Sequence, residues 1–150
     1  MDTEIRHIAI FVSDLRKAED YYQQVFDMGI LGRESMLPDG QWYSLPTDKG
    51  WQDAERAGIE IGMLALQRSA FTIALFPGDR QPGQLYIVGL NMPVEEIKAV
   101  RDRLPADTEV WQDEPEALTF RDRYQIVWQI YPSGTEFQTS GESQRRWLEI

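Results

Sequence analysis

The sequence contains no cysteine and a single histidine, His7. The lack of cysteine excludes disulfides, a thiolate nucleophile and sulfur-ligated metal sites. No apolar run approaches the roughly 20 residues that a membrane-spanning helix needs. Residues 2–6 carry charges with no apolar run before them, so no secretory leader is expected either. Together these absences predict a cytoplasmic protein that does not insert into membranes.

Positive charge is also scarce, with 15 Lys and Arg against 25 Asp and Glu and a net charge of −10. A nucleic-acid surface needs clustered basic residues, whereas the arginines at 101–103 and 121–123 alternate with acids. No nucleic-acid partner is therefore expected. An acidic surface favours cationic ligands at long range, or serves solubility alone. The 42% of apolar residues is enough for a substantial core.

The most regular stretch of the chain runs from residue 5 to residue 28. Residues 8–12 are apolar and rich in β-branched types, which is typical of a buried strand. Ser13 and Asp14 are suited to cap a following helix. Apolar residues then recur at helical spacing and predict one buried stripe: Leu15, Ala18, Tyr22, Val25 and Phe26. Gly29 is expected to end the helix.

The rest of the chain repeats this order of elements. Phe71–Gly78 aligns with Ile126–Ser133 at an offset of 55, and the two first strands align at an offset of 78. These alignments predict two β-α-β-β-β modules and a C-terminal tail that is loose or docks on a partner subunit. The predicted divisions are residues 1–78, with a long aromatic loop at 38–58, a linker at 79–83, a second module at 84–134 and a tail at 135–150.

The opening H-I-A-I-F-V-S-D-L-R-K-A-E-D-Y-Y-Q-Q-V-F and the tandem layout resemble the vicinal oxygen chelate superfamily. This superfamily includes glyoxalase I, bleomycin-resistance proteins and extradiol dioxygenases. The resemblance implies an α+β fold, in which tandem modules form a curved, half-barrel-like mixed sheet with a central cleft. It also implies a homodimer. Because the superfamily hosts many chemistries, it does not define the activity.

In the superfamily a divalent metal is held by residues on the first and last strand of each module. Carried onto this chain by the internal alignment, those positions are His7, Ala74, Leu85 and Gln129. One imidazole and one neutral amide fall short of the donor set of a catalytic metal centre. No cofactor is therefore expected. If a metal binds, His7 and Gln129 are the predicted ligands, with Glu60 as a substitute donor.

Strand alternation directs every second residue into the cleft. With the aromatic residues of the long loop, it gives nine candidate ligand-binding residues: His7, Phe11, Trp42, Tyr43, Trp51, Leu85, Trp111, Gln129 and Tyr131. Aromatic walls with a few polar groups are typical of a small-molecule pocket, although tryptophans also serve simply as core. His7 is a candidate general acid or base, or a structural histidine that bonds to the backbone.

Three hypotheses for function follow. The first is metal-independent binding of a small apolar or cationic organic compound in the cleft, as in the bleomycin-resistance branch that the chain resembles. The second is a glyoxalase-like lyase or isomerase, or a dioxygenase, that uses His7 with a divalent metal. The third is a non-catalytic interaction protein whose cleft is filled by Phe11, Phe76 and Leu85.

Overall fold

The computed structural model describes residues 3–78, 83–122 and 125–150. The elements in chain order are β1 (Glu4–Val12), α1 (Leu15–Phe26), β2 (Gly29–Met36), β3 (Trp42–Ser44), α2 (Trp51–Arg56), β4 (Met63–Arg68), β5 (Phe71–Pro77), β6 (Leu85–Met92), α3 (Val94–Arg103), β7 (Glu109–Glu114), β8 (Ala117–Arg121), β9 (Val127–Pro132) and α4 (Ser140–Gln144). Within the described residues, every helix is too short or too polar to cross a membrane.

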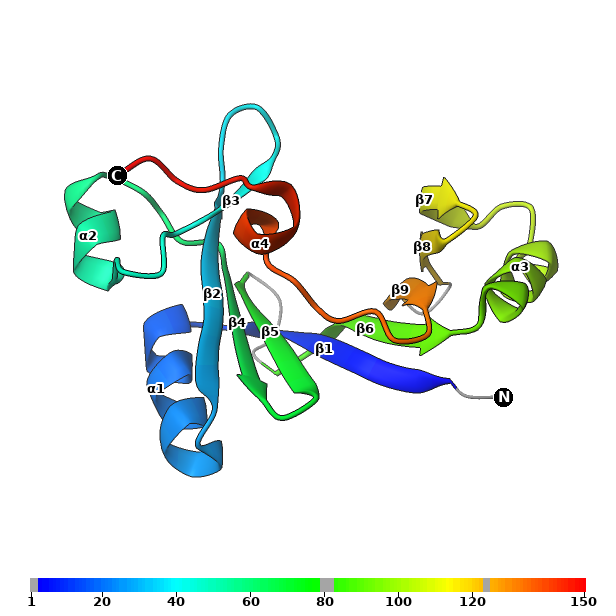
Figure 1. Ribbon diagram of the computed structural model, residues 1–150, viewed down its shortest axis with the longest axis horizontal. Helices are drawn as coiled ribbons and strands as arrows, with labels where there is room; N and C mark the ends of the chain where they lie inside the picture. The colour runs from blue at the N-terminus through cyan, green and yellow to red at the C-terminus, as the bar shows by residue number, and fades with distance from the viewer. Residues whose placement is uncertain (1–2, 79–82, 123–124) are drawn as a thin grey trace.

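All nine strands form one mixed sheet in the order β3-β2-β4-β5-β1-β6-β9-β8-β7. At its centre β1 pairs antiparallel with β6, while β5 lies parallel to β1 and β9 parallel to β6. The sheet curves, so that β2–β3 and β7–β8 rise on opposite sides of this central pair (Figure 1). The predicted α+β class with a curved mixed sheet is confirmed. The predicted linker at 79–83 lies outside the described residues except for Gly83, so the module boundaries stay a prediction.

The first helix begins where the sequence predicts and ends slightly earlier. The Asp14 side chain accepts a hydrogen bond from the Lys17 N–H, which caps α1. At the other end Asp27 adopts the left-handed conformation with φ 53°, and Gly29 is the first residue of β2 instead of a cap. Val25 and Phe26 of the predicted stripe are about half exposed, so the buried stripe is shorter than predicted.

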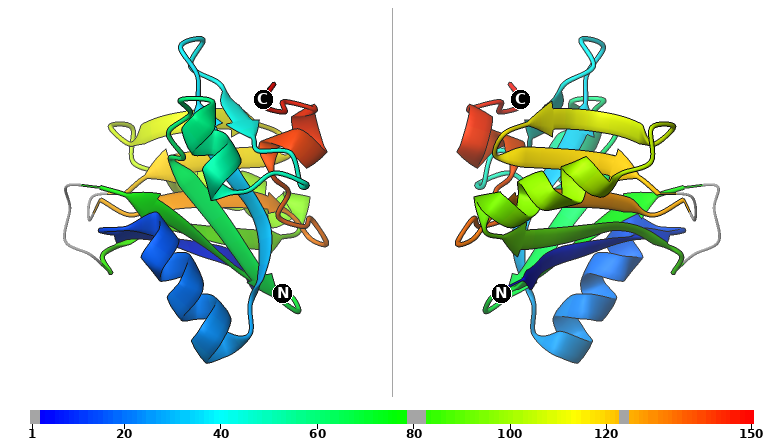
Figure 2. Two further views of the ribbon diagram at one scale, coloured as in Figure 1. Left: turned by 90° about the vertical axis from the view of Figure 1, so that its left-hand side faces the viewer. Right: turned by 90° about the vertical axis from the view of Figure 1, so that its right-hand side faces the viewer.

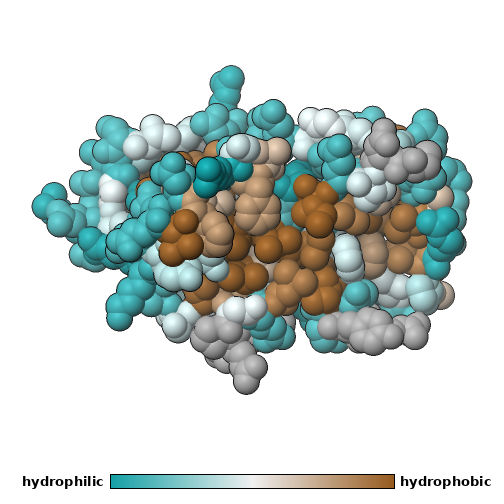
Figure 3. Space-filling model, turned by 90° about the horizontal axis from the view of Figure 1, so that it is seen from below, coloured by the Kyte–Doolittle hydropathy of each residue, from teal (hydrophilic) through white to brown (hydrophobic). Residues whose placement is uncertain are grey.

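Three apolar clusters fill the fold. One packs α1 and α2 on the outer face of the first strands, and a second packs α3 on β8 and β9. The third lies inside the curve and includes Ala9, Ala74 and Val127. Helices α1 and α3 sit apart on the outer face (Figure 2), and the middle of that face shows a gathering of apolar side chains (Figure 3). Ile5 of β1 and Leu85 of β6 are among the exposed apolar residues.

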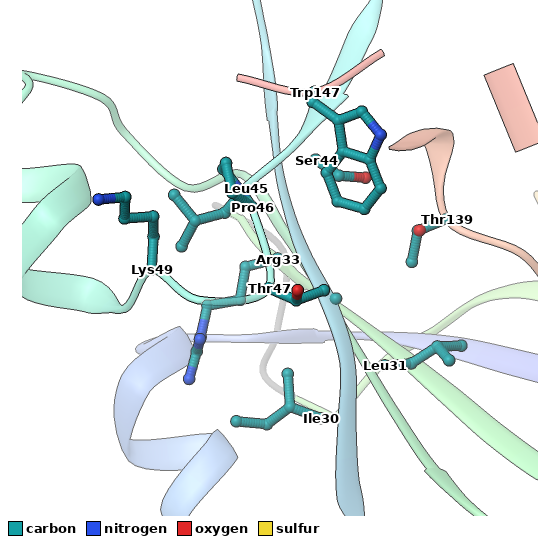
Figure 4. Close-up of a pocket in the computed structure, with 11 residues that line it drawn as sticks. Ile30, Leu31, Arg33, Ser44, Leu45, Pro46, Thr47, Lys49, Thr139 and Trp147 are labelled. Carbon is teal, nitrogen blue, oxygen red and sulfur yellow. The ribbon is translucent and has the colours of Figure 1, made fainter. Parts of the chain in front are cut away.

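The C-terminal tail packs against its own chain, which corrects the expectation of a loose or partner-bound segment. It runs from β9 back to β3 and α2 (Figure 1). The Ser44 N–H donates to the Arg146 carbonyl, and the Leu148 N–H donates to the Ser44 carbonyl, both at 2.7 Å. Leu148 is buried in the first cluster. Thr139 and Trp147 line a cavity of about 130 Å³ beside Ser44 (Figure 4).

A buried ion pair fastens α1 and α2 to the sheet. Arg33 of β2 donates from Nε to Oε1 of Glu19 at 2.8 Å, and the Trp51 indole donates to Oε2 of the same carboxylate at 2.9 Å. The Glu19 side chain is only 5% exposed. One carboxylate thus joins three elements, and removing it would leave a buried guanidinium and a buried indole N–H unpaired.

We expect Glu19→Ala to lower the free energy of unfolding by about 3–5 kcal/mol, because an uncompensated charge stays buried. Urea denaturation measures this. The matched control is Glu55→Ala, which removes the partner of Arg16 from an exposed pair and is expected to cost less than about 1 kcal/mol. Equal losses in the two variants would contradict a special role for the buried pair.

Candidate functional site

A cavity of about 210 Å³ lies inside the curved sheet. It is lined by side chains from both halves of the sheet and from the C-terminal segment: Arg6, His7, Glu34, Trp42, Met63, Ala74, Phe76, Ile87, Gln129, Tyr131, Phe137, Gln138 and Ser140. A second cavity, of about 330 Å³, adjoins it and shares Arg6 and Phe137 with it. The pair of cavities occupies the cleft that the family resemblance implies.

Four of the nine candidate ligand-binding residues line the smaller cavity, namely His7, Trp42, Gln129 and Tyr131. The residues that strand alternation predicts to face the cleft are correct for β5 and β9. On β5, Ala74 pairs with Ala9 and lines the cavity, and on β9 both Gln129 and Tyr131 line it. Whether these side chains touch a ligand stays a prediction. The lining also contains side chains that sequence reasoning missed, chiefly Arg6, Glu34 and Phe137.

The prediction that Leu85 lines the cleft is wrong, because the register of the β1–β6 pairing differs from the predicted one. A β-bulge shifts the β1–β6 pairing, so Leu85 lies opposite Ile10 and on the outer face of the sheet. Ala9 pairs with Ile87 and His7 pairs with Gly89. His7 pairs with Thr72 of β5, and Ile87 pairs with Val127 of β9, which lies 55 residues after Thr72. Ile87 is therefore the counterpart of His7, and the two first strands correspond at an offset of 80 instead of 78. Ile87 lines the cavity.

The other four candidates lie elsewhere. Tyr43 and Trp51 pack on the outer apolar cluster. Trp111 is 45% exposed on β7, beneath the Arg121 guanidinium. Phe11 lies within the curve and packs on Tyr86, with ring centroids 4.8 Å apart, but it does not line the cavity. Aromatic residues on edges and loops gave no periodic signal by which the sequence could have separated wall from surface.

His7 is buried at the centre of the cleft. Its Nδ1 has no hydrogen-bond partner among the described residues, and the Phe137 ring covers it edge-on at 4.8 Å between centroids. The ring also lies flat against Gly89, where an added Cβ would sit 2.1 Å from Nδ1. Burial, then the Arg6 charge, lower the pKa of His7 to about 3, while a hydrogen bond with Gln129 raises it.

Arg6 reaches the cleft because of a second bulge in β1. The pairing with β6 shifts between Ile5 and His7, which lets the consecutive side chains of Arg6 and His7 both face the cavity. The Arg6 guanidinium carbon lies 4.4 Å from the centroid of the Tyr131 ring and 5.6 Å from that of Phe137. Burial lowers the pKa of Arg6.

Glu34 is the buried carboxylate of the cavity. It lies on β2 opposite Met63 and Ser44, and its Oε2 accepts a hydrogen bond from the Ser140 N–H at 3.0 Å. It therefore ties the C-terminal segment to the sheet. Glu60, the substitute metal donor predicted from the sequence, is exposed to solvent.

The positions of the family's metal ligands hold His7, Ala74, Ile87 and Gln129. Two of these offer no donor atom, and the amide of Gln129 is a neutral, weak one. Across residues 3–78, 83–122 and 125–150, no three His, Asp or Glu side chains are grouped closely enough to hold a metal ion. The side chains of the cleft do not fit a three-ligand catalytic centre.

Comparison with protein families supports the fold. The profile of the Glyoxalase/Bleomycin resistance protein/Dioxygenase superfamily matches residues 4–130. The chain therefore belongs to this superfamily. A comparison with curated protein sequences finds no match.

Several solved structures share the fold at low sequence identity. A hypothetical protein from Bacillus halodurans C-125 is 13% identical with a TM-score of 0.54, covering 93% of this chain and 100% of its own. The 2,2',3-trihydroxybiphenyl 1,2-dioxygenase of Sphingomonas wittichii strain RW1 is 16% identical (TM-score 0.56), and a mutant 4-hydroxymandelate synthase of Streptomyces coelicolor is 15% identical (TM-score 0.54). Both matches cover 93% of this chain. The chain spans 45% of the length of the dioxygenase and 52% of that of the synthase. These likenesses concern the fold alone.

We expect Gly89→Ala to destabilise the protein by about 1–3 kcal/mol, because the new methyl group collides with the buried His7 ring. The same substitution in a His7→Ala background is expected to cost close to nothing, since the ring is gone. Urea denaturation of the four proteins measures the coupling. Gly50→Ala, where a Cβ meets open space, is the control. Equal costs in both backgrounds would contradict the contact.

The titration of His7 can be followed without assignment, because it is the only histidine. We expect its ring-proton NMR signals to stay in the neutral form from pH 8 to pH 5 and to titrate near the folded pKa of about 3. Because the folded pKa lies below the ordinary 6.5, the stability that neutral His7 provides is complete above pH 6.5 and is lost toward pH 3. The His7→Gln variant should not show this loss of stability at low pH. A titration midpoint of the His7 signals near pH 6.5 would contradict the burial of the ring.

Proposed function

We propose that this protein binds a small, largely apolar organic compound in its cleft without the help of a metal ion. The observation that carries the proposal is the lining of the 210 Å³ cavity, in which aromatic and aliphatic side chains stand beside polar ones that converge from the strands and the C-terminal segment. Ligand sites are built in this way. An empty apolar cavity of about 150 Å³ already admits benzene, so a compound with one ring is of suitable size.

The choice between an apolar and a cationic compound depends on the charge inside the cleft. The acidic surface of the chain attracts cations at long range. Within the cleft, however, the Arg6 guanidinium borders both cavities and would repel a cation bound beside it. The apolar compound is therefore the better supported of the two.

Metal independence is supported by the donor set of the cleft. Of the four family positions only His7 carries a strong ligand, since Ala74 and Ile87 offer no donor atom and Gln129 offers a neutral amide. The alternative function, a glyoxalase-like lyase, isomerase or dioxygenase, would need Glu34 to join His7 and Gln129. Glu34 lines the same cavity, which makes it the residue through which that alternative is best tested.

Elemental analysis of the purified protein, before and after dialysis against zinc, iron, manganese and nickel, separates the two functions. We expect less than one tenth of an equivalent of metal per chain. A stoichiometric metal that is lost in both His7→Ala and Glu34→Gln would contradict metal independence and would favour the enzyme.

Binding itself can be tested with benzamide as a neutral probe. Because Trp42 lines the cavity, we expect saturable quenching of its fluorescence that disappears in Trp42→Phe. Ala74→Leu fills the cavity and should weaken binding at least tenfold, because Ala74 is a buried part of the wall. The matched control, Ala57→Leu, adds the same volume at an exposed position and should bind normally. Unchanged binding in Ala74→Leu would contradict the site.

The homodimer and the cytoplasmic location remain predictions. The apolar side chains on the outer face of the sheet, visible in Figure 3, make that face the first place to look for contacts between subunits.

A further inference from the structure

The cleft contains a positive charge that forms no ion pair with any acidic side chain of the described residues. Arg6 forms no ion pair or conventional hydrogen bond within the described part of the chain, and its Nε is buried without a partner. Its contacts there are with the aromatic faces of Tyr131 and Phe137. Aromatic rings attract a guanidinium and hold it in one orientation, but they leave its charge and its N–H donors unsatisfied.

Three carboxylates line the two cavities that Arg6 borders, yet none of them is its partner. Glu34 accepts its hydrogen bond from the Ser140 N–H. Glu4 and Glu136 line the second cavity, of about 330 Å³, and both are exposed to solvent. None of these carboxylates forms an ion pair with the guanidinium within 4.0 Å. The Arg6 side chain is partly buried and its Nε is fully enclosed. A cation removed from water is normally paired, so this one marks a place for an outside anion.

We infer that the ligand of the cleft carries a carboxylate, and that Arg6 binds this carboxylate between the Tyr131 and Phe137 rings. The inference rests on the proposed function and adds the chemical class of the compound: a small apolar acid with one negative charge. Its ring would occupy the apolar cavity beside Ala74 and Phe76, and its charged end would lie at Arg6, where the two cavities meet.

The chemistry of Arg6 suits a carboxylate. A guanidinium presents a planar set of donors that matches the two oxygens of a carboxylate, and such paired bonds are among the strongest in proteins. The contacts with the two aromatic rings restrict the guanidinium in advance, which reduces the entropy lost on binding. Arg6 is the one lysine or arginine among the described residues that line the two cavities, so it matches a single negative charge better than two.

The net charge of −10 does not oppose this assignment. Charges at the surface act through water and are screened over roughly 8 Å at physiological ionic strength, whereas Arg6 acts at contact in a partly desolvated site. The surface charge slows the approach of an anion, and the buried guanidinium sets its affinity.

Benzoate, benzamide and benzamidinium test the inference, because they share one planar shape and carry charges of −1, 0 and +1. We expect benzoate to bind wild-type protein at least tenfold more tightly than either of the others. Arg6→Met keeps much of the side-chain stem and should abolish this preference. Arg16→Met makes the same change in net charge at an exposed arginine and should keep it. The NMR signal of His7, beside Arg6, must shift on binding.

The outcomes separate this inference from the proposed function. Benzamide binding as tightly as benzoate would overturn the carboxylate and leave the apolar site intact. A preference for benzoate that persists in Arg6→Met would overturn the assignment to Arg6, as would binding that leaves the His7 signal unmoved. Failure of all three probes to bind would overturn the inference and the proposed function together.

Discussion

The antiparallel pairing of β1 with β6 is the constraint on which the rest of the structure depends. It joins the two halves of the sheet, places β5 and β9 on either side, and so sets the width of the cleft. At its centre the His7 ring lies against Gly89, so that only a residue without a side chain fits there. The cleft therefore has no freedom to change register: moving one strand by one residue would bury the outer face and expose the inner one.

Much of the fold follows from local sequence patterns, whereas the site depends on irregularities that leave no pattern. Periodicity predicts β1 and α1, and the offset of 55 correctly pairs Ala74 with Gln129 across the cleft, because those strands are regular. Two bulges in the β1–β6 pairing, one at Arg6 of β1 and one at Tyr86 of β6, break the alternation on which the prediction for Leu85 and the omission of Arg6 both relied. A bulge depends on pairing between distant strands, so strand alternation within one segment cannot reveal it.

The C-terminal segment shows a second limit of sequence reasoning. Its polar composition resembles that of a free tail, but it reaches the sheet through backbone hydrogen bonds with Ser44 and through the Glu34 carboxylate. Such contacts require no periodic apolar side chains. Through Phe137 the segment supplies one wall of the cleft and lines both cavities, so the cavity volumes are set partly by residues outside the repeated modules.

The electrostatics of the cleft weigh against acid–base catalysis and in favour of binding. A general base works best when its pKa is close to the working pH, and the His7 pKa of about 3 makes it a weak acceptor of protons at neutral pH. The same burial that weakens His7 strengthens Arg6, because the attraction of a guanidinium for an anion grows as water is removed. Burial thus affects the two neighbouring side chains in opposite ways. His7 loses its capacity for proton transfer at neutral pH, and Arg6 gains a stronger attraction for an anion.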